Sequence, residues 1–135
     1  MPNSGPPWVT TVLVAVTVEN IPVIPAAATE YPIASFGTLN TASSDYQTVR
    51  KWTVTAGRIG ILQSVEMACN NYEVAQFELI VKGVTVFVNK TMPESFTKEW
   101  PELHLAAGES VELLTKSNGS DLINVWCDFN GKEVA

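Results

Sequence analysis

The stretch Ala75-Gln76-Phe77-Glu78-Leu79-Ile80-Val81-Lys82-Gly83-Val84-Thr85-Val86-Phe87-Val88 decides the fold class. Apolar side chains recur at every second position before and after Lys82-Gly83, as expected of two β-strands that each bury one face. A two-residue connection that contains glycine is typical of a tight hairpin turn. This stretch therefore predicts an antiparallel β-hairpin.

The same period of two continues on both sides of the hairpin. It runs through Arg58–Cys69 upstream and through Ile123–Phe129 near the C-terminus, and no window shows apolar residues at helical spacing. Phe96–Trp100 forms another alternating run before Pro101, which either ends a strand or confines it to a sheet edge. Roughly eight short strands in about ninety residues from Tyr46 predict an all-β fold, an antiparallel two-sheet sandwich.

The first 45 residues have a different composition. Residues 1–49 contain no Lys or Arg, and prolines gather in the first 32 positions. One strand is expected over Val12–Val18, and an extended, proline-punctuated apolar segment follows it. The segment is too apolar for a disordered tail. We therefore expect an extended N-terminal arm over residues 1–45 and a β-sandwich over residues 46–135.

An extended apolar arm requires a surface to lie on, either the flank of its own domain or a neighbouring subunit. Trp8 is the best anchor, because a large aromatic side chain on an extended arm gains most by entering a pocket on a partner. The residues expected to contact a partner are Pro6, Pro7, Trp8, Val9, Ile21, Pro22, Ile24, Pro25 and Tyr31.

The charge balance excludes one class of partner. Eight Lys and Arg against fourteen Asp and Glu give a net charge of -6. Nonspecific nucleic-acid binding depends on clustered cations, so no nucleic-acid partner is expected. The apolar run Val9–Val18 is too short to span a bilayer, so no membrane role is expected either.

No catalytic, cofactor or metal site is expected from the residue patterns. His104 is the single histidine, and no GxSxG, HExxH or DxDxDG motif is present. The glycines are scattered singly and form no phosphate-binding loop. Glu99 and Glu102 beside Trp100 leave a glycosidase as a minor alternative, against the favoured interpretation of a solvated acidic edge. The chain is therefore expected not to be an enzyme.

The two cysteines, Cys69 and Cys127, both fall on the inward-facing positions of their strands. Their spacing fits neither a zinc site nor a CxxC redox motif. Reduced, buried thiols are the favoured interpretation, and the sequence alone leaves a bridge between them open.

Trp126 and Trp100 form a possible exposed aromatic platform. On the last predicted strand, Trp126 points away from the inward set Ile123, Val125, Cys127 and Phe129, whereas Trp100 can also face inward. An exposed tryptophan on a sheet is either a sugar-stacking surface or an interface anchor. A third interpretation is that the N-terminal arm covers Trp126.

Four stretches carry a family resemblance: Ala56–Glu66, Ala75–Leu79, Leu105–Leu113 and Asn124–Glu133. Together they resemble jelly-roll-like head decoration (cement) proteins of tailed phages, and similar turn-and-alternation patterns occur in carbohydrate-binding modules. The phage resemblance implies a structural virion protein on the outer capsid surface, a homo-oligomer with a trimer favoured, whose arm binds the major capsid protein. The alternative is a carbohydrate-binding or receptor-binding β-sandwich module.

Overall fold

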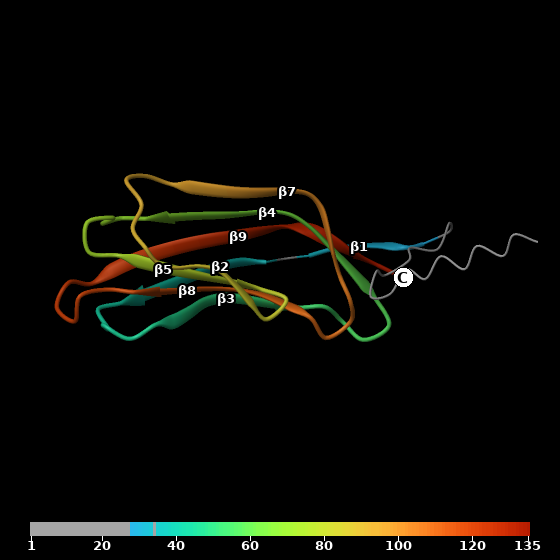
Figure 1. Ribbon diagram of the computed structural model, residues 1–135, viewed down its shortest axis with the longest axis horizontal. Helices are drawn as coiled ribbons and strands as arrows, with labels where there is room; N and C mark the ends of the chain where they lie inside the picture. Colours follow the sequence, from blue (N-terminus) through green and yellow to red (C-terminus); the bar gives the residue numbers. More distant parts are fainter. Residues whose placement is uncertain (1–27, 34) are drawn as a thin grey trace, which may run out of the picture.

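Nine β-strands and no helix form the part of the chain that the structure describes, residues 28–33 and 35–135 of a computed structural model (Figure 1). Strands β4, β7 and β9 are the longest. The strands are β1 (Glu30–Pro32), β2 (Phe36–Thr41), β3 (Gln47–Thr53), β4 (Ile59–Cys69), β5 (Gln76–Val81), β6 (Val84–Lys90), β7 (Phe96–Leu105), β8 (Ser110–Lys116) and β9 (Ile123–Val134).

The strands form two antiparallel sheets that pack as a sandwich. Sheet A has the order β1-β9-β4-β7, with β2 also paired to β9, and sheet B has the order β3-β8-β5-β6. The pairs β2–β9, β3–β8, β4–β7 and β5–β6 are nested, from the second strand paired with the last inward to the central hairpin. This nesting is the winding of a jelly roll. The expected all-β sandwich is confirmed.

The central hairpin has the turn that its sequence predicts. Lys82 and Gly83 both have positive φ, 54° and 76°, which is the backbone of a type I′ turn. Beyond the turn, the pairing of β5 with β6 shifts register twice, so β6 contains extra residues. These bulges interrupt the simple alternation expected for Val84, Val86 and Val88, and all three side chains are exposed.

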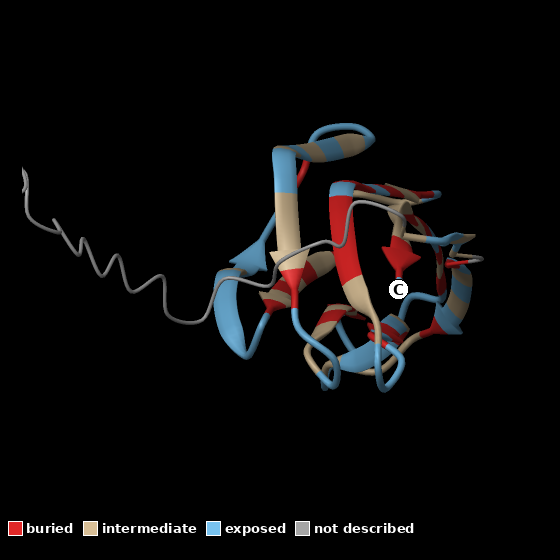
Figure 2. Ribbon diagram, turned by 90° about the vertical axis from the view of Figure 1, so that its right-hand side faces the viewer, coloured by how far each residue is buried: buried red, intermediate tan, exposed pale blue. Residues whose placement is uncertain are grey.

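The core lies between the sheets and comes from the inward-facing positions of both. Buried positions alternate with half-buried ones along β5, β8 and most of β9. Figure 2 shows bands of buried (red) and intermediate (tan) residues along strands of the sandwich. The last strand buries its expected inward set, so that Trp126 and Asp128 face outward. Side chains with almost no exposure include Phe77, Leu79, Leu113, Val125 and Phe129.

Pro101 lies within β7 and does not end it. Strand β7 continues to Leu105 and is the outer strand of sheet A, where one side of the backbone needs no ladder hydrogen bonds. The register with β4 shifts between Leu62 and Ser64, so the extra residues around Pro101 are accommodated as a bulge.

The sandwich begins earlier in the chain than residue 46. Strands β1 and β2 pair with β9, so residues 30–41 are part of sheet A. Pattern reading missed β2 because Gly37, Thr38 and Asn40 give it only a weak apolar alternation. The expected strand over Val12–Val18 and all the expected contact residues except Tyr31 lie outside the described residues.

The described residues include no helix that is long and apolar enough to cross a membrane.

Candidate functional site

A groove of about 360 Å³ lies on the outer face of sheet A, the face that does not pack against sheet B. Strands β2, β4, β7 and β9 all contribute to it. Its lining consists of Phe36, Glu66, Met67, Ala68, Ser95, Phe96, Thr97, Trp126, Cys127 and Asp128.

Two aromatic side chains stand in this groove. Trp126 is 39% exposed and Phe36 is 61% exposed. Phe36 pairs with Asp128, two residues from Trp126, so the two rings occupy diagonal positions on one face of neighbouring strands. Diagonal partners have Cα atoms about 7–8 Å apart, within reach of aromatic side chains. A single exposed apolar side chain is ordinary, but two adjacent aromatic rings form an apolar patch, which makes this pair a candidate contact surface.

The hollow beside Trp126 follows from the strand register. Trp126 stands opposite Thr38 on one side and Ala68 on the other. The side chain of Ala68 is a single methyl group, so it fills little space beside Trp126, and both residues line the groove. The sheet therefore has a depression at this point, with the tryptophan as one wall.

A parallel row of side chains crosses the same face of sheet A two residues further along β9, at Asp128. In this row Phe36 pairs with Asp128, Asp128 with Glu66, and Glu66 with Thr97, from β2 across β9 and β4 to β7. Directly opposite residues have Cβ atoms about 5 Å apart, so the carboxylates of Asp128 and Glu66 are close neighbours. The row presents an aromatic ring, two carboxylates and a hydroxyl group along one line.

The two carboxylates face one another without a neutralising partner. Like charges directly opposite on a sheet are destabilising. The ion pairs among the described residues include Arg58–Glu133, Lys82–Glu109, His104–Glu102 and Lys132–Glu30, and neither Asp128 nor Glu66 takes part in one. No Lys or Arg lines the groove. The fold thus tolerates a local electrostatic cost at this site.

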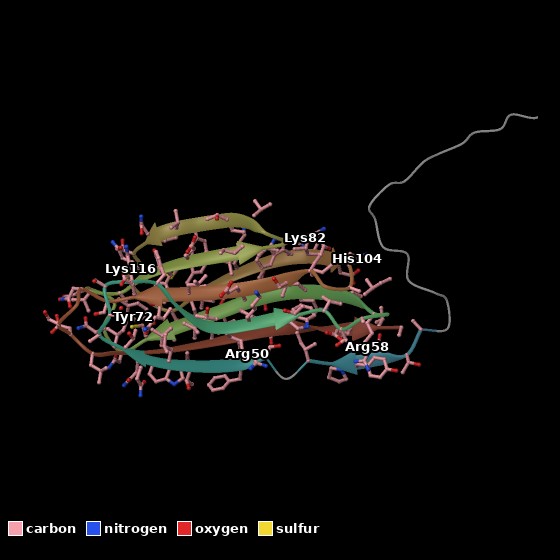
Figure 3. All side chains as sticks on the ribbon, turned by 90° about the horizontal axis from the view of Figure 1, so that it is seen from below. Arg50, Arg58, Tyr72, Lys82, His104 and Lys116 are labelled. Carbon is pink, nitrogen blue, oxygen red and sulfur yellow. The ribbon has the colours of Figure 1, made fainter. Side chains whose placement is uncertain are left out.

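The opposite end of β9 has the reverse electrostatic character. Glu133, only 4% exposed, accepts hydrogen bonds from the Trp52 indole Nε1 at 2.8 Å, from the Thr55 backbone N–H at 3.3 Å and from Arg58 Nη1 at 3.3 Å. The Arg58 guanidinium also lies 3.6 Å from the centre of the Tyr31 ring. Figure 3 shows Arg58 at this end of the sandwich, beside β1.

The pKa of Glu133 reflects this hydrogen-bond network. Burial is the largest single influence and raises the pKa, but the hydrogen bonds from Trp52, Thr55 and Arg58 together outweigh it. The net effect is a pKa below the ordinary value, so the carboxylate stays charged within the fold. This cluster links β1, β3 and β9 and is structural.

Both cysteines are buried free thiols. They lie at diagonal positions on the inner face, because Met67 pairs with Cys127 and Cys69 with Val125. Burial raises the pKa of the Cys127 thiol to about 12 and also raises the pKa of Cys69. The thiolate is the reactive form, so these side chains behave as small apolar core residues.

The other residues singled out in the sequence lie outside the groove. Trp100 is half-buried and packs against the core, with the Lys98 ammonium 5.8 Å from its ring centre. Glu99 is exposed and pairs with Ser64, while Glu102 lies 4.0 Å from His104. Tyr31 packs under Arg58. In the described ranges, no group of three or more His, Cys, Asp or Glu side chains could hold a metal ion.

Sequence reasoning found Trp126 but not its neighbours. The alternation along β4 and β9 puts Glu66 and Asp128 on outward positions, yet nothing in either strand alone says that they stand opposite each other. Phe36 was missed because β2 has a weak pattern. One signal for the groove is present in the sequence: Glu66, Trp126 and Asp128 all fall on the outward positions of their strands.

Comparison with protein-family models gives no match for this chain, and comparison with curated proteins gives none either. The function is therefore argued from the groove and from the fold.

Proposed function

We propose that this protein is a non-catalytic binding module that holds a carbohydrate in the groove on sheet A. The observation that carries the proposal is Trp126, an exposed aromatic ring beside a hollow and a line of hydrogen-bonding side chains. An aromatic face packs against the apolar face of a sugar ring, while carboxylates and hydroxyls bind the sugar's hydroxyl groups.

The geometry of the groove suits this ligand class. It is an open depression on a rigid sheet and not an enclosed cavity, so it can admit a chain that extends beyond the site. Its polar groups, Asp128, Glu66 and Thr97, lie in one row beside the aromatic pair. Sites on regular strands hold their side chains in fixed positions, which reduces the ordering cost of binding. Jelly-roll domains also include lectins.

A glycan array followed by calorimetry on the best ligand tests this proposal. We expect Trp126→Ala to weaken binding by about tenfold or more, the effect of removing an aromatic anchor. Leu122→Ala is the control, because Leu122 is an exposed apolar residue of the same strand region outside the groove, and this variant should bind normally. A protein that binds no glycan, or a Trp126→Ala variant that binds as tightly, would contradict the proposal. The bound oligosaccharide should be recovered intact.

A second candidate is the structural virion role implied by the phage resemblance. One observation favours it. The edge strand β6 exposes Val84 by 66%, Val86 by 41% and Val88 by 49%. Apolar side chains on an unpaired sheet edge are typical of protein–protein contacts. In this candidate, copies of the chain associate along β6, and the N-terminal arm binds the major capsid protein on the outer capsid surface.

The oligomeric state in solution tests the second candidate. We expect an oligomer by light scattering that Val86→Lys dissociates, while Leu122→Lys, an equivalent charge at another exposed apolar position, leaves it intact. Phage heads should bind the full chain better than a chain without residues 1–27, a deletion that retains all nine strands. A monomer with no affinity for heads would contradict this candidate.

A further inference from the structure

We infer that the groove on sheet A selects carbohydrates that carry a free, positively charged amine over neutral and acidic ones. This inference rests on the proposed carbohydrate binding and specifies its ligand class. It begins from Glu66 and Asp128, which stand directly opposite each other in the groove. Two facing carboxylates form a site that is complementary to one cation.

The chain itself offers no cation for this site. Among the described residues, neither carboxylate forms an ion pair, and the lining contains no Lys or Arg. The remaining part of the chain cannot supply a basic side chain either, because residues 1–49 contain no Lys or Arg at all. A ligand that brings its own positive charge therefore has two carboxylates available to it in the groove.

The surroundings of the pair favour an amine on a sugar over a bare ion. Trp126 and Phe36 lie beside the carboxylates, and a ligand ammonium near an aromatic face gains a cation–π attraction. The same rings provide the apolar surface for the sugar ring that carries the amine. Thr97, opposite Glu66, adds a hydroxyl at the other end of the row.

The occupant we propose is an oligosaccharide with unmodified amino-sugar units. Its ammonium groups donate charge-assisted hydrogen bonds to Glu66 and Asp128, which are stronger than bonds between neutral groups. N-acetylation removes the charge, and a uronic acid reverses it. Both changes should weaken binding, the second one more, because it adds a third negative charge to the site.

Calorimetry with a glucosamine oligomer and its fully N-acetylated counterpart tests the inference. We expect the free-amine oligomer to bind about tenfold more tightly in buffer that keeps the amine protonated, the effect of one charge-assisted hydrogen bond. Added salt should reduce this preference because it screens the exposed charges. A polyuronate oligomer should not bind.

Three variants connect the preference to the carboxylates. Glu66→Gln and Asp128→Asn should each reduce the amine preference while Trp126 remains necessary for binding. Thr97→Lys places a cation beside Glu66 within the chain and should have the same effect. Glu73→Gln, the same change of net charge in an exposed loop, is the control and should retain the preference.

The outcomes separate this inference from the proposed function. Equal or tighter binding of the N-acetylated oligomer, still dependent on Trp126, would overturn the amine preference and leave the carbohydrate proposal standing. Binding of a lysine-rich peptide but of no oligosaccharide, with the same dependence on Glu66 and Asp128, would overturn both.

Discussion

Charged side chains have opposite environments in the two halves of strand β9. Near the C-terminus, Lys132 pairs with Glu30 and the buried Glu133 accepts three hydrogen bonds. Towards the start of the same strand, Asp128 faces Glu66, and neither carboxylate is in an ion pair with another described residue.

Glu133 is a structural charge, whereas Asp128 and Glu66 are charges that remain available to a ligand. A buried charge must be satisfied within the fold, because an unpaired one is very costly. An exposed pair of like charges costs little and leaves both groups free to bind. One strand thus contributes a structural carboxylate, Glu133, to the core and, in the function that we propose, a ligand-binding carboxylate, Asp128, to the surface.

The largest expected effect is at the structural end. Glu133→Ala removes the acceptor for the Trp52 indole and the partner of Arg58. We expect a loss of about 3 kcal/mol in the free energy of unfolding, since a buried donor and a partly buried cation lose their partner. Urea denaturation measures it, with Glu102→Gln on an exposed carboxylate as the control. A loss as small as that of the control would show that the network is not structural.

Acid should also destabilise the cluster around Glu133, because it protonates the carboxylate. The pKa of Glu133 is lowered in the folded protein, so its stabilisation is fully present above the ordinary pKa and is lost as the pH falls through the folded value. The free energy of unfolding measured against pH should therefore decline in acid more steeply for the native chain than for Glu133→Gln. Parallel curves would contradict this assignment.

The smallest expected effect is at the groove and has the opposite sign. Asp128→Asn removes one of two facing like charges, so we expect a gain of about 0.5 kcal/mol in the free energy of unfolding. Thermal and urea denaturation measure it, with Glu73→Gln as the control of equal charge. A loss of stability would show that Asp128 is a structural carboxylate like Glu133, and the contrast between the two ends would fail.

The fold could be predicted from the sequence because its signals are local. The Lys82-Gly83 turn and the alternation along β4, β5, β8 and β9 depend on neighbouring residues, which pattern reading can detect. Strand β2 was assigned to the arm because its small and polar residues give little pattern. Its pairing with β9 is what makes it a strand.

The groove could be predicted only in part because it depends on register. Trp126 is outward by parity along β9 alone. The neighbours Phe36 and Glu66 are far from Asp128 in the sequence, and they meet it only through the pairings of β9 with β2 and β4. Parity assigns a residue to a face, whereas register decides which residues share a site.

The nested strand order also bears on how this chain acquires its structure during synthesis. Strand β9 lies between β2 and β4 in sheet A, so that sheet lacks its centre until residues 123–134 have left the ribosome. The hairpin of β5 and β6 can form early, because its contacts are short in sequence. Closing β2 onto β9 spans most of the chain and carries a large loop entropy. Folding is therefore expected to wait for the synthesis of residues 123–134, and to be slow compared with that of a helical protein of similar length.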